Sequence, residues 1–376
     1  MKSVFIYSDE FGKFKVSKDY PWLTERSDVT YRRCSELNLL DRDWMKVVKP
    51  RTAAIKDLYT YHTKEYIQLL RKADKGVFEE SMLIHGLGTL ECPAAKGLFK
   101  YHTLAAGATI CGADLICRKK ADTVFSPTGG FHHAGPDFAS GFCYINDINI
   151  AVKKLLNHRK RVLYVDIDTH HGGMVQEAFY SNPGVMYISF HESGKTLFPW
   201  KTGFETEIGK GKGKGYNINF PLPENTGDDE FLWGFERVLP PVAKAFNPDV
   251  VVAVIGVDMM FSDPMSHLRL TNNAFVKAVG MIKECAPELL ALGCGGYVLN
   301  NIERSWTLAW AAMNGLLPVE DESMTFGGMF WGDGLSSLMD RPHFSPEDIR
   351  KKTAKEMKRV YRYIKKQIFP ILEIRR

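Results

Sequence analysis

The sequence predicts an α/β protein in which a mostly parallel sheet is covered by helices on both faces. Short, almost entirely apolar runs that end in glycine or acidic residues alternate along the chain with longer amphipathic segments. Such runs indicate strands that are buried on both faces, which is typical of parallel sheets. There is no internal repeat and no linker rich in proline and serine, so we expect residues 1–376 to form a single domain.

The predicted elements alternate in the order that this class requires. Strands are expected at residues 3–7, 122–126, 185–190, 249–258 and 289–297, with a central strand that starts at about residue 162. Helices are expected at residues 32–40, 64–73, 96–116, 147–156, 175–180, 229–246, 274–284 and about 346–368. The segment 208–216 alternates glycine with lysine but lacks the spacing of a phosphate-binding loop, so we interpret it as a surface loop.

Composition excludes several broad classes of protein. The net charge of +5 is mild, so we expect neither nucleic acid nor a membrane as a partner, and the oligomeric state stays open. The last predicted helix is strongly basic, and a solvated surface is the favoured interpretation of it. The seven cysteines show no C-x-x-C spacing, and no apolar run is long enough to span a bilayer. We therefore expect a soluble cytoplasmic protein with reduced thiols.

The central strand ends in a run of ionisable residues. After an apolar start, Asp166, Asp168 and His170 follow at alternate positions. Alternate residues of a strand project to the same face. Two carboxylates and an imidazole on one buried face are costly without a cation between them. The alternative is that the aspartates cap a helix or pair with a basic side chain.

Reactive residues also follow three other predicted strands. These are His132 with His133, Asp258, and Tyr297, and three of the four strand ends are flanked by glycine. The carboxyl ends of parallel strands lie at one edge of a sheet, so all of these side chains are expected to converge there.

Asp168, His170 and Asp258 would then supply two oxygen ligands and one nitrogen ligand to a divalent metal, with a position left open for chemistry. Zn²⁺ fits this set, and Fe²⁺ also fits it by ligand type. Such a metal activates water and polarises a carbonyl group. With an imidazole as proton carrier and Tyr297 as a donor to the oxyanion, these parts suit amide hydrolysis.

The motifs, in their order along the chain, resemble those of the zinc-dependent histone deacetylase family. The closest resemblance is to its class I-like bacterial members and the acetoin-utilisation proteins, and it extends from the first strand to about Gly315. The motifs are Pro127-x-Gly-Gly-x-His132-His133-Ala134, Gly141-Phe142-Cys143-Tyr144-x-Asn146, Asp166-x-Asp168-x-His170-His171-Gly172, Gly256-x-Asp258 and Gly295-Gly296-Tyr297.

The resemblance implies a single-domain, arginase-like α/β/α fold of three layers around an eight-stranded parallel sheet, with the catalytic motifs between residues 126 and 297. It also implies a zinc-dependent lysine deacylase. Such an enzyme removes acetyl or other short acyl groups from the lysine side chains of a protein or peptide, or from a small acylated amine.

The resemblance also assigns roles to individual residues. It implies that His132, His133 and Tyr297 are catalytic, that Asp166 supports His132, and that Asp168, His170 and Asp258 bind the metal. The substrate-binding residues that it implies are Glu91, Gly141, Phe142, Phe198, Met265 and Arg26. Glu91 would hold the substrate backbone, and Arg26 would line an internal cavity below the metal. A structural K⁺ is implied beside Asp166, Asp168, His170, Ser189 and Phe190.

The chain departs from the family pattern at two places, at Gly173-Met174 and at Cys294. The family usually has Asp or Asn after His-His-Gly, where its side chain supports the second tandem histidine, but this chain has Gly173 followed by Met174. We expect His133 to stay neutral to lower pH as a result. Cys294, before Tyr297, is interpreted as a small buried thiol.

Two alternative functions stay open. One is a metal-loaded binding module that has lost turnover because of Gly173. The other is an acylpolyamine amidohydrolase, which would need a narrow acidic entrance. The acyl group and the natural substrate are left open.

Overall fold

The computed structural model describes residues 2–15, 20–317, 325–326, 329–330 and 334–374. At its centre lies one sheet of eight strands, all of which run parallel to their neighbours. The strands are β1 (Ser3–Ile6), β2 (Met45–Val48), β3 (Thr123–Ser126), β4 (Val162–Asp166), β5 (Val185–Glu192), β6 (Asn217–Leu222), β7 (Val250–Val254) and β8 (Glu288–Leu292). Their order across the sheet is β2-β1-β3-β8-β7-β4-β5-β6. A short antiparallel pair, β9 (Thr325–Phe326) and β10 (Met329–Phe330), is separate from it.

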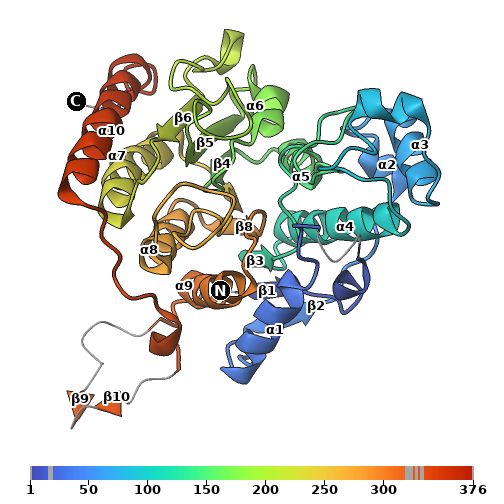
Figure 1. Ribbon diagram of the computed structural model, residues 1–376, viewed down its shortest axis with the longest axis horizontal. Coiled ribbons are helices and arrows are strands. Elements are labelled where there is room, and N and C mark those ends of the chain that lie inside the picture. Colours follow the sequence, from blue (N-terminus) through green and yellow to red (C-terminus); the bar gives the residue numbers. More distant parts are fainter. Residues whose placement is uncertain (1, 16–19, 318–324, 327–328, 331–333, 375–376) are drawn as a thin grey trace.

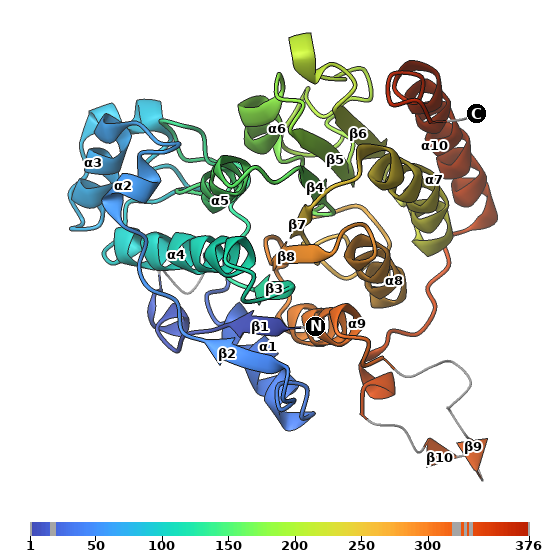
Figure 2. The same cartoon turned by 180° about the vertical axis from the view of Figure 1, so that it is seen from behind.

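Helices cover both faces of the sheet and complete a three-layer α/β/α arrangement (Figures 1 and 2). One face carries α1 (Arg26–Glu36), α7 (Asp228–Phe246), α8 (Asn272–Lys283), α9 (Leu299–Met313) and α10 (Glu347–Gln367). The other face carries α4 (Leu98–Cys117), α5 (Asp147–Asn157) and α6 (Gly173–Phe179). The helices α2 (Ile55–Leu58) and α3 (Lys64–Ala73) lie outside this second layer. Short 3₁₀ turns occupy Phe11–Lys13, Glu80–His85, Gly211–Gly213 and Ser336–Leu338.

The central strands are apolar throughout because both of their faces are buried. In β4, Leu163 and Val165 join the core beneath α7 to α9, whereas Val162 and Tyr164 join the core beneath α4 and α5. The same alternation recurs in β7 and β8. Successive strand side chains point to opposite faces, so a strand that lies between two helical layers needs an apolar residue at every position. The predicted parallel sheet is therefore confirmed, together with its eight strands.

Several predicted boundaries were wrong. The helix predicted at residues 32–40 is α1, which begins six residues earlier at Arg26 and ends at Glu36. The strand β4 was expected to carry the alternating residues as far as His170, but it ends at Asp166. The strands β7 and β8 also end early, at Val254 and Leu292. The reactive residues therefore lie on loops just beyond the strands, where side-chain direction no longer follows a two-residue period.

The sequence analysis predicted neither β2, β6 and α9 nor the shorter α2, β9 and β10. The strands β2 and β6 form the two edges of the sheet. Edge strands carry exposed or polar residues, such as Lys46 in β2, and Pro221 in β6 is typical of an edge because it cannot donate to a neighbouring strand. The helix α9 has a polar beginning, but it buries Trp306 and Trp310 completely.

The basic C-terminal helix forms as predicted and packs against the body of the protein. Met357, Val360 and Ile364 of α10 are buried, and the helix lies beside α7 and β6. Most of its lysine side chains are exposed, whereas Arg350 pairs with Asp229 and Glu230 of α7 and Arg359 pairs with Glu205. In the part of the chain that the structure describes, no helix has the length and apolarity that crossing a membrane requires.

The glycines of two helices give a direct test of this packing. Gly107 of α4 touches the segment before α2 so closely that an added methyl group would overlap the carbonyl oxygen of Arg51. A methyl group added to Gly280 of α8 would have no other atom within 4 Å. We expect Gly107→Ala to lower the free energy of unfolding by about 1–3 kcal/mol. Gly280→Ala should raise it by roughly 0.5–1 kcal/mol, because alanine favours a helix interior. Urea unfolding of the two variants measures both effects, and equal shifts would contradict this packing.

Candidate active site

Loops that follow β3, β4, β7 and β8 bring the predicted reactive residues together at the carboxyl edge of the sheet. Nδ1 of His170 lies 3.2 Å from Oδ1 of Asp168 and 3.0 Å from Oδ2 of Asp258. One ligand atom from each of these three residues lies within 4.8 Å of the other two. All three side chains are buried. The structure therefore assembles the predicted ligand set from two separate loops.

The buried carboxylates of this cluster share their charge with neighbouring imidazoles. Burial raises the pKa of Asp258 to about 7, and the neighbouring Asp168 adds to the rise. Burial also acts to raise the pKa of Asp168, but His132 and His170 hold it well below its ordinary value. Burial alone would lower the pKa of His170, yet the two carboxylates raise it to about 10. A proton on His170 occupies the place that a cation would take, and two carboxylates with one imidazole fit a divalent metal.

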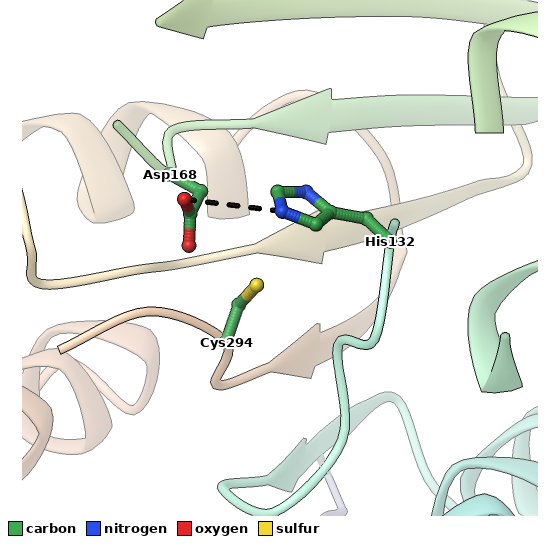
Figure 3. Close-up of side chains that lie close together, drawn as sticks. All are labelled: His132, Asp168 and Cys294. Atoms are coloured by element: carbon green, nitrogen blue, oxygen red, sulfur yellow. Dashed lines mark ion pairs between the residues drawn. The ribbon is translucent and has the colours of Figure 1, made fainter. Parts of the chain in front are cut away.

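A second group of metal-ligand residues shares Asp168 with the first. His132, Asp168 and Cys294 come from three different loops and lie close together (Figure 3). Nε2 of His132 is 3.9 Å from Oδ1 of Asp168. Burial, with Asp168 as a further cause, raises the pKa of the Cys294 thiol well above its usual value. Because a metal binds the thiolate, the protonated thiol disfavours this group, and Asp168 fits better with His170 and Asp258.

The tandem histidines differ in their surroundings. Nδ1 of His132 is 2.9 Å from Oδ2 of Asp166, and the Tyr164 hydroxyl donates to the same oxygen at 2.6 Å. Burial works to lower the pKa of His132, but Asp166 and Asp168 outweigh it and raise the pKa. Nε2 of His132 is 3.0 Å from Nε2 of His133. The pKa of His133 lies well below the ordinary value because of burial and the neighbouring His132. One imidazole of the pair therefore favours the charged form and the other the neutral form.

The loop that carries these histidines is held by hydrogen bonds to Asp147, a buried residue whose role the sequence analysis missed. Asp147 begins α5, and its two carboxylate oxygens accept hydrogen bonds from the backbone of Gly130 at 2.9 Å and Phe131 at 2.8 Å. The Thr109 hydroxyl of α4 donates to it as well. Nothing in the local sequence separates Asp147 from an ordinary acidic residue in the first turn of a helix. Its role depends on the loop packed over it.

The loop before Tyr297 is held in place by two carboxylates and one guanidinium group. The Gly295 backbone donates to Oδ2 of Asp168 at 2.7 Å, and the Tyr297 backbone donates to Oδ2 of Asp263 at 2.9 Å. The fully buried Arg26 donates to the carbonyl oxygens of Cys294 and Gly296 and stacks on a tryptophan. Arg26 was predicted to line an internal cavity. In the structure, its guanidinium braces the turn that carries the tyrosine.

The predicted substrate-binding residues Glu91, Gly141, Phe142, Phe198 and Met265 line a cavity of about 340 Å³. His133, His170 and Tyr297 line the same cavity. The sequence analysis did not identify the other residues of its wall, which are Leu197, Trp200, Pro264, Ser266 and His267.

The residues predicted for K⁺ lie on the neighbouring strands β4 and β5 and on the loop that follows β4. Ser189 pairs with Asp166 across these strands, and its hydroxyl lies 2.7 Å from Nδ1 of His191. The K⁺ site stays a prediction.

Comparison with known proteins identifies the family. The model of the histone deacetylase domain matches residues 20–313. The chain belongs to the histone deacetylase family. It is 36% identical to the acetoin utilization protein AcuC of Bacillus subtilis over 84% of this chain and 83% of that protein. It is 32% identical to human histone deacetylase 1 over 94% of this chain and 72% of that protein.

Solved structures of histone deacetylase homologues share the fold. A homologue solved in complex with SAHA is 33% identical, with a TM-score of 0.84, over 97% of this chain and all of that chain. The homologue from Aquifex aeolicus is also 33% identical, with a TM-score of 0.81, over 95% of this chain. Family membership makes the protein a hydrolase that acts on amides.

Gly173 leaves open space at the position where this chain departs from the pattern of its family. A β-carbon built on Gly173 would meet only the His171 ring, at 3.5 and 3.6 Å. Gly173 and His133 line a second cavity, of about 420 Å³. Nδ1 of His133 has no hydrogen-bond partner among the described residues. Burial is the largest cause of the low pKa of His133, and an effect of Gly173 relative to other family members stays a prediction.

Asp147 offers a test of how the histidine loop is held. Asp147→Ala leaves the buried N–H groups of Gly130 and Phe131 without acceptors, at about 1–3 kcal/mol each. We expect a loss of roughly 2–5 kcal/mol in the free energy of unfolding and a large fall in activity. Thr109→Val removes only the hydroxyl donor and should cost about 1 kcal/mol. Chemical denaturation and turnover, measured on the same preparations, test whether Asp147→Ala loses more stability and activity than Thr109→Val. Equal losses in the two variants would contradict the role of Asp147 in holding the loop.

Proposed function

We propose that this protein is a metal-dependent lysine deacylase that removes acetyl or other short acyl groups from lysine side chains of a peptide or protein. The observation that carries the proposal is that His170, in contact with Asp168 and Asp258, lines one cavity together with His133 and Tyr297. Two carboxylates and an imidazole suit Zn²⁺, and Fe²⁺ fits by ligand type. A metal held there supplies a Lewis acid for water and for the amide carbonyl.

The side chains of this chain do the remaining work. His133 is neutral and lines the cavity, so it can accept a proton from the attacking water. His132 is held by Asp166 and can carry positive charge beside it. Burial raises the pKa of Tyr297 well above its usual value, so the phenol keeps its proton and can donate to the oxyanion.

The walls of the cavity support an acylated alkylamine as substrate. Phe142 and Phe198 are partly exposed aromatic rings on the wall, and the Phe142 ring centroid lies 5.9 Å from that of Tyr297. Apolar walls suit the methylene chain of lysine, whereas the exposed carboxylate of Glu91 offers an acceptor to the substrate backbone. A structural K⁺ and a cytoplasmic location are further parts of the proposal. A binding module without turnover and an acylpolyamine amidohydrolase stay as alternatives.

A panel of acyl-lysine peptides, assayed with and without a chelator, tests the proposal. We expect hydrolysis that the chelator abolishes and Zn²⁺ or Fe²⁺ restores. Asp258→Asn should lose both bound metal and turnover. Tyr297→Phe should keep the metal and lose about 10²–10³-fold in kcat, the cost of one oxyanion donor. The surface change Asp41→Asn is the matched control. Metal binding without hydrolysis of any peptide would favour the binding module, and full activity of Tyr297→Phe would remove the tyrosine from the mechanism.

Gly173→Asp tests the departure from the family pattern. The open space at Gly173 admits the side chain, and a carboxylate in the cavity that Gly173 shares with His133 stabilises the imidazolium form of His133. The pKa of His133 should rise, so the acidic limb of the pH–rate profile should move to higher pH. Proton delivery to the leaving amine should improve, so kcat should increase at neutral pH. The measurement is kcat from pH 5 to 9, and an unchanged profile would exclude this position from the proton relay.

A further inference from the structure

One histidine at the rim of the cavity is held by a buried carboxylate and was not part of any predicted site. Nδ1 of His267 is 2.7 Å from Oε1 of Glu192, and the His267 backbone donates to Oε2 at 2.9 Å. Glu192 ends β5 and is fully buried, while the His267 side chain is 53% exposed. The Thr196 hydroxyl donates to the same carboxylate at 2.9 Å. The ring of His267 therefore has a fixed orientation.

This orientation leaves one ring nitrogen for a ligand. Because Nδ1 donates to Glu192, Nε2 is the atom that remains, and it has no hydrogen-bond partner among the described residues. His267 lines the cavity together with Met265 and Trp200. The bond to Glu192 raises the pKa of His267, so the ring favours the form in which Nε2 also carries a hydrogen. The rim thus presents an oriented N–H donor.

The charges around His267 indicate which acceptor it takes. Glu192 and Glu224 are the acidic groups that face the ring, with Glu224 at 3.9 Å from Nδ1, and Arg269 is the neighbouring cation. The two carboxylates already compensate the imidazolium, so a further anion would gain little. These three residues, Glu192, Glu224 and His267, also lie close enough to hold a metal. However, the Glu192 oxygens already accept three hydrogen bonds. A neutral carbonyl oxygen is therefore a better partner for Nε2–H than an anion or a metal ion.

We propose that Nε2–H of His267 donates a hydrogen bond to a backbone carbonyl oxygen of the substrate, as one half of a clamp whose other half is Glu91. The inference rests on the proposed deacylase function. A carboxylate that accepts backbone N–H groups and an imidazole that donates to a backbone C=O are complementary to a peptide bond. A simple acylated amine offers neither partner. The clamp therefore selects acyl-lysine within a peptide.

The test compares two substrates with the same acylated side chain. An acetyl-lysine peptide has the backbone, and N-pentylacetamide has the side chain alone. In His267→Ala, the ratio of kcat/KM for the peptide to that for N-pentylacetamide should fall about tenfold or more, mainly through KM. His158→Ala, at an exposed histidine after α5, is the matched control and should keep the wild-type ratio.

The pH dependence separates this role from a purely structural one. In the wild type, KM for the peptide should rise as pH rises through the pKa of His267, because Nε2 then loses its hydrogen. In Glu192→Gln the rise should begin at lower pH, since a neutral amide no longer favours the imidazolium. In His267→Ala the rise should disappear. A wild-type KM that does not change with pH would overturn the proposal.

Other outcomes separate the clamp from the proposed function. An equal loss on both substrates in His267→Ala would overturn the clamp and leave the deacylase intact. A divalent metal that is bound by the wild type and lost in Glu224→Gln would also overturn it. If the wild type hydrolyses neither substrate, the proposed function fails, and the clamp is then tested by anisotropy of a labelled acetyl-lysine peptide. Binding that is tenfold weaker in His267→Ala would support it, and equal affinity would overturn it.

Discussion

The cost of burying several carboxylates together in the interior governs the architecture of this site. Asp166, Asp168 and Asp258 are buried within one region, where an unpaired charge would be very costly. Each of them accepts hydrogen bonds from neighbouring groups. Asp166 accepts from the Asp168 backbone at 3.0 Å, Asp168 from the His170 and Gly295 backbones, and Asp258 from the Thr169 backbone at 3.0 Å. The donors lie on different loops, so the bonds that stabilise the charges also hold the loops together.

This double use of the carboxylates explains why the reactive groups need not lie on strands. Asp166 accepts a hydrogen bond from the loop after β4, and Asp168 accepts one from the loop after β8. Arg26 donates two further hydrogen bonds to the loop after β8. The loop after β3 is fixed in the same way by Asp147. A site built from loops is then as firmly positioned as one built on strands, because every loop has a buried charged anchor. The apolar sheet supplies the dry surroundings in which these bonds are strong.

The sequence predicted the parts of the molecule that depend on local pattern. The buried strands, most helices and the convergence of Asp168, His170 and Asp258 follow from apolar runs and from ionisable residues placed after them. The edge strand β2 was missed because the exposed Lys46 and Val47 weaken its apolar signal. The strand β6 is buried, but Asn217, Asn219 and Pro221 interrupt its apolar run. Asp147 was missed, and the hydrogen bonds of Arg26 to the loop before Tyr297 were not foreseen, because both depend on backbone that is distant in sequence. The ends of β4, β7 and β8 were set too late, since a two-residue period continues by chance into a loop.

Side chains are buried at the base of the cavity and exposed at its rim. This difference in burial separates the catalytic groups from those that would select the substrate. At the base, burial shifts the pKa of every ionisable group and makes each proton part of one coupled set. At the rim, Glu91 is exposed and His267 is half exposed, so substitutions there change few other groups. Glu192 connects the two levels because it ends β5, the strand beside β4, and yet holds the ring of His267. Recognition at the rim is therefore oriented by the same sheet that positions the metal ligands, while its charge can titrate without disturbing them.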